Sequence, residues 1–199
     1  MTEAVPVRAA ASVILWRASK GAPQVLMGQR GSAAVFMPSK YVFPGGGVDA
    51  GDHSTGHLPP ACTTRLTRHC PADTPTPDAL CGCALRELAE ETGFHLPVRA
   101  PLQFIFRAIT PAGAPRRFDA RFFLAGAAQI GADLNDFSAA TDELGHLHWI
   151  GLHQARRLDL PFITEVVLAE VAALLAGIPQ PGVPFFDNSG PVPAFRRLT

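Results

Sequence analysis

The side chains best spaced to do chemistry are three glutamates, Glu87, Glu90 and Glu91, which lie within two turns of a predicted helix. At about 100° of rotation per residue, their carboxylates fall within an arc of about 100° and share one helix face. Such close like charges repel each other unless basic partners, raised pKa values or a bound cation compensate. Arg86 has the i,i+4 spacing to pair with Glu90, which leaves Glu87 and Glu91. Carboxylates at that spacing suit Mg²⁺ or Mn²⁺, although a solvated acidic helix face would have the same sequence.

A glycine run upstream, Gly45 to Gly47, favours the metal site over the solvated face. Glycine lacks a Cβ atom, so backbone in this segment can come close to a phosphate or a metal, and the carbonyl of Gly46 can serve as an oxygen ligand. We predict a tight glycine turn after the apolar residues 41–43. A divalent cation held here would neutralise diphosphate oxygens and lower the pKa of a bound water. The two segments together predict cleavage of a pyrophosphate.

These segments resemble the box of the Nudix hydrolase superfamily, G-x5-E-x7-R-E-U-x-E-E-x-G-U, where U is a bulky apolar residue. Gly46 opens the pattern, Asp52 stands at its first glutamate, and residues 86–94 complete it. Two features depart from the pattern. Asp52 shortens the reach of its carboxylate by one methylene, and the long segment 53–85 stands where the standard box has seven residues.

The interruption of the box narrows the resemblance to one branch of the superfamily. Together with residues 36–46 and 115–123, it is similar to the peroxisomal CoA diphosphatase branch of the superfamily and its bacterial relatives. The resemblance implies an α/β protein, a Nudix-type α/β/α sandwich with a mixed β-sheet. It also implies a pyrophosphohydrolase that uses Mg²⁺ or Mn²⁺ and cleaves CoA or acyl-CoA to 3′,5′-ADP and (acyl-)phosphopantetheine.

Other substrates and roles fit the same box. ADP-ribose, a dinucleotide or another nucleoside diphosphate derivative would use the same chemistry, because specificity lies in loops outside the box. A non-catalytic Nudix-fold binding module is a further alternative, and Asp52 is the one box residue that favours it. mRNA decapping or RNA binding is disfavoured, because Lys+Arg and Asp+Glu are equal at 17 each and no basic run is present.

The resemblance assigns roles to residues of the box. Glu87 and Glu91 are expected to bind the metal directly, with Glu90 as the next candidate and the Gly46 carbonyl as a further ligand. Arg86 is expected to hold a glutamate in place.

The general base is expected on a later loop. Glu143, which precedes the strand at 147–150, is the candidate, and an exposed loop acid is the alternative interpretation. His146 and His148 have ordinary pKa values near neutrality, but we interpret both as structural.

Substrate binding requires cations for the outer phosphates and a surface for the base. Arg30, Arg116 and Arg117 are the candidate phosphate ligands, because the guanidinium fork matches phosphate oxygens. Phe36 and Phe118 are candidates to stack on adenine, and each also suits a position in the core.

The elements that position these residues follow from hydrophobic patterning and turn residues. The acidic helix is expected to begin at Thr76-Pro77 and to end at Gly93, because threonine suits the N-cap, proline the first turn and glycine a left-handed C-terminal cap. Gly82 is expected to weaken this helix by about 1 kcal/mol. The other expected elements are strands at 7–17, 24–29, 41–43, 102–110, 117–124 and 147–150, and helices at 61–69 and 160–175.

We expect a single domain over residues 1–199, with an inserted segment at 53–77 and an irregular tail at 179–199. No apolar run approaches the roughly 20 residues that span a bilayer, and residues 9–16 are interpreted as a strand rather than a secretory signal. A cytoplasmic protein is therefore expected, with a nucleotide-derived small molecule as its partner and no nucleic acid or membrane. The sequence does not determine the oligomeric state, and a homodimer is one option.

Four cysteines lie in the interrupted part of the box, at positions 62, 70, 81 and 83. Nearby histidines make a structural zinc site an alternative, but no C-x-x-C pair is present. We interpret the cysteines as free thiols in a variable loop.

Overall fold

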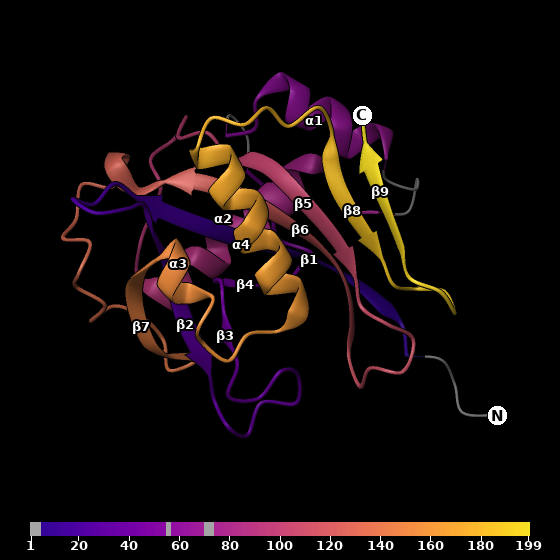
Figure 1. The fold of residues 1–199 in the computed structure, drawn as a ribbon, viewed down its shortest axis with the longest axis horizontal. Helices are drawn as coiled ribbons and strands as arrows, with labels where there is room; N and C mark the ends of the chain where they lie inside the picture. Colours follow the sequence, from indigo (N-terminus) through magenta and orange to yellow (C-terminus); the bar gives the residue numbers. More distant parts are fainter. Residues whose placement is uncertain (1–4, 55–56, 70–73) are drawn as a thin grey trace.

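The computed structural model describes residues 5–54, 57–69 and 74–199, which form a nine-stranded mixed β-sheet with helices on both faces (Figure 1). The strand order is β3-β2-β1-β6-β5-β8-β9, while β4 pairs with β1 and β7 pairs with β2. The strands are β1 (Val7–Arg17), β2 (Gln24–Arg30), β3 (Tyr41–Val42), β4 (Gly45–Gly47), β5 (Gln103–Ile109), β6 (Arg117–Gly126), β7 (Leu144–Gly151), β8 (Val183–Asp187) and β9 (Ala194–Leu198). The helices are α1 (Pro60–Arg68), α2 (Pro77–Thr92), α3 (Leu152–Ala155) and α4 (Phe162–Leu175), with a short 3-10 helix η1 at Ala127–Gln129. No helix in the described ranges is long and apolar enough to cross a membrane.

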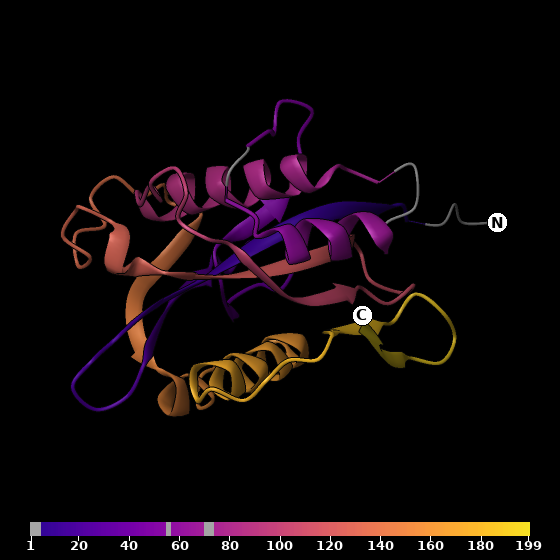
Figure 2. The same ribbon diagram turned by 90° about the horizontal axis from the view of Figure 1, so that it is seen from above.

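The helices form two layers that enclose the sheet. Figure 2 shows α1 and α2 over one face and α4 over the other. Side chains of β6 alternate between the two cores, as the period of a strand requires: Phe123 packs with the α2 core, whereas Phe122 and Leu124 pack with the α4 core. The arrangement confirms the predicted α/β sandwich with a mixed sheet.

The strand β1 is central to this part of the sheet because it pairs with three other strands. It runs parallel to β6 from Val7 opposite Arg117 to Trp16 opposite Gly126. On its other edge it pairs with β4 over Ala10–Ser12 and with β2 at Trp16 and Arg17. The edge of β1 is therefore shared between two short pairings, and the glycine run forms one of them, β4.

The ends of α2 lie where the sequence predicts them. The Thr76 side chain accepts a hydrogen bond from the Ala79 backbone N–H at 3.2 Å, and Gly93 caps the helix in the left-handed region with φ 75°. The prediction that Gly82 only weakens the helix was incomplete. A Cβ atom at Gly82 would lie 2.3 Å from the backbone nitrogen of His53, so the glycine lets the start of the insertion cross the helix closely.

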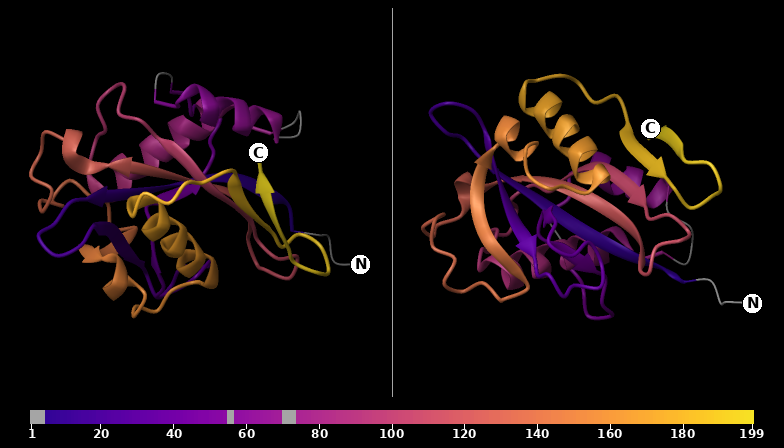
Figure 3. Two further views of the ribbon diagram at one scale, coloured as in Figure 1. Left: turned by 45° about the horizontal axis from the view of Figure 1, so that its top comes forward. Right: turned by 60° about the horizontal axis from the view of Figure 1, so that its bottom comes forward.

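Two predictions about irregular segments were wrong. The glycine run forms a strand, β4, because its extended backbone hydrogen-bonds with β1. The tail from residue 179 is not irregular, because β8 and β9 form a hairpin that extends the sheet beyond β5 (Figure 3). Proline and glycine residues around these short strands obscured their apolar pattern. The other expected strands and helices are present, with ends displaced by a few residues.

A buried charge cluster joins the insertion to the sheet. Asp119 accepts hydrogen bonds from Arg107 Nε at 2.8 Å and Nη2 at 2.7 Å, and Arg121 Nη2 lies 3.1 Å from the same carboxylate. Arg107 Nη1 also donates to the carbonyl of His69 at 2.8 Å, just after α1. One carboxylate thus compensates two buried guanidinium groups on the α1 side of the sheet.

We therefore expect Asp119→Asn to reduce the free energy of unfolding by about 3–5 kcal/mol, because it removes a buried carboxylate charge that is paired with two guanidinium groups. Urea unfolding followed by circular dichroism measures the change. The matched control is Asp159→Asn, which breaks the exposed ion pair with Lys40 and is expected to cost about 1 kcal/mol or less. Equal losses in both variants would contradict a structural role for the cluster.

Candidate active site

The acidic face of α2 lies against β4, and its glutamates differ in burial. Glu91 and Glu87 are 1% and 8% exposed, whereas Glu90 is exposed to solvent. A Cβ atom at Gly46 would lie 2.2 Å from Glu87 Oε1, so only glycine allows the strand to approach this carboxylate. The two halves of the split sequence motif are therefore in direct contact.

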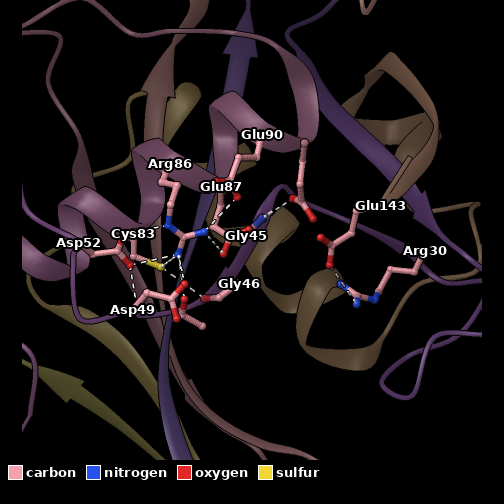
Figure 4. A network of polar contacts seen from close by, with 12 residues as sticks. Arg30, Gly45, Gly46, Asp49, Asp52, Cys83, Arg86, Glu87, Glu90 and Glu143 are labelled. Carbon is pink, nitrogen blue, oxygen red and sulfur yellow. Dashed lines mark hydrogen bonds and ion pairs between the residues drawn. The ribbon is translucent and has the colours of Figure 1, made fainter. Parts of the chain in front are cut away.

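Arg86 holds these carboxylates in place. Its Nη1 atom donates to Glu87 Oε1 at 2.8 Å and to Glu90 Oε2 at 3.1 Å, as Figure 4 shows. Its Nε and Nη2 atoms donate to the two oxygens of Asp52 at 2.8 and 3.1 Å, and Nη2 also donates to the Gly47 carbonyl at 3.0 Å. One guanidinium thus connects the acidic helix, the glycine strand and the residue at the first acidic position of the box.

The shorter side chain of Asp52 reaches Arg86 without strain on either group. Burial alone would raise the pKa of Asp52, but hydrogen bonds from Arg86 and the Asp49 backbone, together with the Arg86 charge, hold it below its ordinary value. The hydrogen bonds from Arg86 to Asp52 raise the pKa of Arg86 in turn. The substitution of aspartate for the first glutamate therefore keeps an ionised partner for the arginine.

Glu91 is the most perturbed group of the site. Its Oε2 atom accepts a hydrogen bond from the Gly45 backbone N–H at 2.8 Å, while its buried Oε1 atom has no hydrogen-bond partner among the described residues. Burial raises its pKa to about 8, and the nearby charges of Glu87 and Glu143 act in the same direction. Burial also raises the pKa of Glu87.

These donors fit a hard divalent cation. A buried carboxylate oxygen with no partner, beside a second buried carboxylate and a closely approaching glycine strand, is a set of oxygen atoms that Mg²⁺ or Mn²⁺ would bind. Within residues 5–54, 57–69 and 74–199, no three His, Cys, Asp or Glu side chains are already gathered around one point as a metal cage. Arg86 occupies part of the acidic face instead, through its bonds to Glu87 and Glu90.

Glu143 faces the acidic helix from the loop before β7. Thr141 on this loop donates its backbone N–H to the Glu90 carbonyl at 2.9 Å, which fixes the loop to the end of α2. The Glu143 side chain is 58% exposed and lies 3.8 Å from Arg30 Nη2 (Figure 4). Its charge contributes to the raised pKa values of both Glu87 and Glu91, so it is close to the pair.

A cavity of about 550 Å³ opens beside this acidic cluster. Its walls bring together most of the residues selected from the sequence: Arg30, Phe36, Gly46, Arg86, Glu87, Glu90, Arg116, Phe118 and Glu143. Phe36 and Phe118 contact each other edge to face, with ring centroids 5.1 Å apart. Glu91 does not line the cavity.

Arg117, His146 and His148, like Glu91, lie outside the cavity lining. Arg117 points its guanidinium at backbone carbonyls, with Nε 3.4 Å from that of Thr110. His148 Nδ1 lies 2.6 Å from the His146 carbonyl, and the His148 ring packs against Tyr41. These contacts involve the ring of His148 and the backbone of His146, so a structural role for the His146 side chain stays a prediction.

Arg8 is a lining residue that sequence reasoning missed. It lies on β1 opposite Phe118, with its guanidinium 3.4 Å from the position of a Cβ atom on Gly47. Arg8, Ala10 and Ser12 alternate along β1 toward the cavity, and that alternation was the available signal.

The cysteines do not lie in a variable loop, which corrects that part of the prediction. Cys62 is on α1 and Cys81 and Cys83 are on α2, and all three are buried free thiols. Burial raises the pKa values of Cys81 and Cys83 to about 12, so neither is a reactive thiolate near neutral pH. Cys70 lies outside the described residues.

The chain is similar to known proteins in sequence and in fold. No protein-family model matches the sequence. A curated Caenorhabditis elegans protein named "Putative nudix hydrolase 7" is 30% identical over 177 residues, which cover 72% of this chain. The chain spans about half of that relative, 51% of its length.

Solved structures of Nudix proteins share the fold. A NUDIX hydrolase from Alicyclobacillus acidocaldarius is 25% identical, with a TM-score of 0.58 over 84% of this chain and 92% of that one. The C. elegans Ap4A hydrolase, at 17% identity, has a TM-score of 0.54 over 86% of this chain and 99% of that one. The NUDIX domain of Shewanella oneidensis NrtR, solved with ADP ribose, is 15% identical, with a TM-score of 0.57 over 85% and 89%. The chain is therefore similar to Nudix hydrolases in sequence and in fold, and its split box resembles theirs in residue type.

Proposed function

We propose that the protein is a metal-dependent pyrophosphohydrolase that cleaves the diphosphate of a nucleoside diphosphate derivative, with CoA or acyl-CoA as the preferred substrate. The products would be 3′,5′-ADP and (acyl-)phosphopantetheine. The observation that carries the proposal is the buried oxygen of Glu91 that lacks a partner, beside buried Glu87 and the glycine strand. Such an arrangement is costly for stability unless a cation or a proton compensates it.

Glu87 and Glu91 would hold the metal, with Glu90 and the Gly46 carbonyl as further oxygen donors. When bound, Mg²⁺ or Mn²⁺ would neutralise diphosphate oxygens and lower the pKa of a coordinated water. Arg86 acts through these residues, because its hydrogen bonds orient Glu87 and Glu90.

Glu143 is our candidate general base. It lines the same cavity as Glu87, it is solvent-accessible, and it lies 3.8 Å from Arg30 Nη2. A carboxylate in this position would accept the proton of the attacking water.

The remaining cations and aromatic rings of the cavity would bind the rest of the substrate. Arg30, Arg116 and the newly found Arg8 are available for phosphate oxygens, because guanidinium groups bind them through paired hydrogen bonds. The adenine ring would pack on Phe36 or Phe118, which already form an aromatic pair. Arg117 is a weaker candidate, since its guanidinium is directed at backbone carbonyls.

ADP-ribose and dinucleotides remain the alternative substrates of the same chemistry. They are favoured by two neighbours of the fold, one named as an Ap4A hydrolase and one solved with ADP ribose. A non-catalytic binding module is less favoured here, because Glu87, Glu90 and Glu91 are all retained and Asp52 still pairs with Arg86.

The activity is tested by incubating the purified protein with Mg²⁺ or Mn²⁺ and CoA, acetyl-CoA, ADP-ribose, NADH or diadenosine polyphosphates. We expect hydrolysis of CoA esters and a loss of kcat of about 100-fold or more in Glu91→Gln, because the metal loses a charged ligand. Glu165→Gln, an exposed glutamate on α4, is the matched control and is expected to retain activity. Equal inactivity of the wild type and Glu91→Gln on every substrate would contradict the enzyme assignment.

The metal proposal also predicts how stability depends on pH. Burial raises the pKa of Glu91 to about 8 in the folded protein, from 4.5. The folded state therefore binds a proton more tightly than the unfolded chain, and this group destabilises the metal-free fold increasingly as pH rises from about 4.5 to about 8. Glu91→Gln mimics the protonated acid. With a chelator present, we expect it to raise the free energy of unfolding by roughly 2–4 kcal/mol near pH 9 and to have little effect near pH 5.

Urea unfolding at both pH values measures this difference, with Glu165→Gln as control. Addition of Mn²⁺ is expected to remove the advantage of Glu91→Gln, because the metal stabilises only the wild-type carboxylate. An effect of Glu91→Gln that is the same at both pH values would exclude Glu91 as the titrating group.

A further inference from the structure

The register of the sheet aligns small residues beneath the cavity. Gly47 of β4 lies opposite Ala10, which lies opposite Ala120, and Ala120 lies opposite Ala108. The next residue in this row is Phe186 of β8. Residues directly opposite one another project to the same face of a sheet, and all five line the cavity. The floor of the cavity is therefore a row of one glycine and three alanines that ends at a phenylalanine.

Larger side chains flank this floor on both sides. Phe118 and Phe122 lie two residues before and after Ala120 on β6, point to the same face and also line the cavity. Residues two apart on a strand are separated by about 7 Å, so the walls stand about 13 Å apart at their Cα atoms. After their side chains fill part of this width, the trough between them suits a chain-like group rather than a second ring system.

The length of the trough follows from strand spacing. Neighbouring strands lie about 4.8 Å apart, so the row from β4 to β8 spans about 19 Å. It begins beside Gly46 and Glu87, at the acidic end. A second nucleoside or a ribose attached to the scissile diphosphate would cover only the first part of this distance.

The far end of the trough is apolar and partly uncovered. Phe162, at the start of α4, lies 5.9 Å from Phe186 between ring centroids and is 66% exposed although it lines the cavity. Ile163 of α4 lines the cavity as well. A ligand that covered these side chains would gain the free energy of removing apolar surface from water.

We propose that the row Gly47–Ala10–Ala120–Ala108 is a channel that selects diphosphates whose second group is an extended chain about 19 Å long and apolar at its far end. The charged end of the cavity would hold the diphosphate, and Phe162 and Phe186 would cover the chain terminus. This inference rests on the proposed function for the position of the diphosphate. It makes Ala108 and Ala120 specificity-determining residues, because any larger side chain there would fill the channel.

The test compares thioesters of CoA of increasing chain length, from acetyl to dodecanoyl, with ADP-ribose as a substrate that lacks a chain. The phosphopantetheine arm itself occupies most of the channel, so in the wild type kcat/KM is expected to rise about two- to fourfold for each of the first few methylenes and then to level off. Ala108→Leu is expected to lower the ratio of kcat/KM for the dodecanoyl ester over ADP-ribose by tenfold or more. Ala112→Leu, in the exposed turn before β6, is the matched control and should leave the ratio unchanged.

A second variant keeps the test decisive if Ala108→Leu does not fold. Phe162→Ser changes an exposed side chain, so it is expected to fold normally while reducing the gain in kcat/KM per methylene. A wild-type kcat/KM that does not depend on chain length, or variants that leave the ratio unchanged, would overturn the channel.

Calorimetric binding of the same thioesters to chelator-treated protein separates the channel from the enzymatic proposal. Affinity that rises with chain length in the wild type and not in Ala108→Leu supports the channel even if no substrate is hydrolysed. Affinity that is independent of chain length overturns the channel even if the protein is an active hydrolase.

Discussion

The guanidinium group of Arg86 connects every segment that the site needs. It binds Asp52 before the insertion, Glu87 and Glu90 on α2, and the Gly47 carbonyl on β4. Because these segments are distant in sequence, a hydrogen-bonded cation between them fixes the position of α2 relative to the glycine strand. The site tolerates the long interruption of the box because Arg86 joins its two sides directly. Lysine has a single nitrogen head and could not donate to all these oxygens at once.

The same packing that orders Arg86 leaves Glu91 in an unfavourable environment. The glycine strand lies so close to α2 that Glu91 and Glu87 lose contact with water, and one oxygen of Glu91 has no partner in the described part of the chain. A fold that buries acids in this way is less stable without a compensating charge. Stability and function are therefore opposed at this position, as expected when a binding site is organised before its ligand arrives.

Sequence reasoning located the parts of the site whose signals are local. The helix caps at Thr76 and Gly93 and the acidic face of α2 follow from residue types at fixed spacing. Features that depend on distant contacts were missed. The glycine run forms a strand because β1 pairs with it, and Gly82 is required because His53 crosses the helix there.

The cavity lining likewise combines residues that local sequence signals identify with features that depend on distant contacts. Arg30, Phe36 and Phe118 were identifiable as candidates by residue type, but their convergence depends on the order of the strands. The floor of the cavity could not be predicted, because isolated alanines carry no signal until strand register places Ala10, Ala120 and Ala108 in one row. The hairpin of β8 and β9 was missed for a related reason, since its strands are short and pair at the edge of an already formed sheet.

The most direct test of this account is a calorimetric titration of the protein with Mn²⁺ near pH 7, repeated in buffers with different ionisation enthalpies. Burial raises the pKa of Glu91 to about 8, so this carboxyl carries a proton that a bound metal must displace. We predict binding with release of about one proton in the wild type, and weak binding without proton release in Glu91→Gln. Tight Mn²⁺ binding in Glu91→Gln, or the absence of binding in the wild type, would contradict the central claim that the buried acidic face is a metal site.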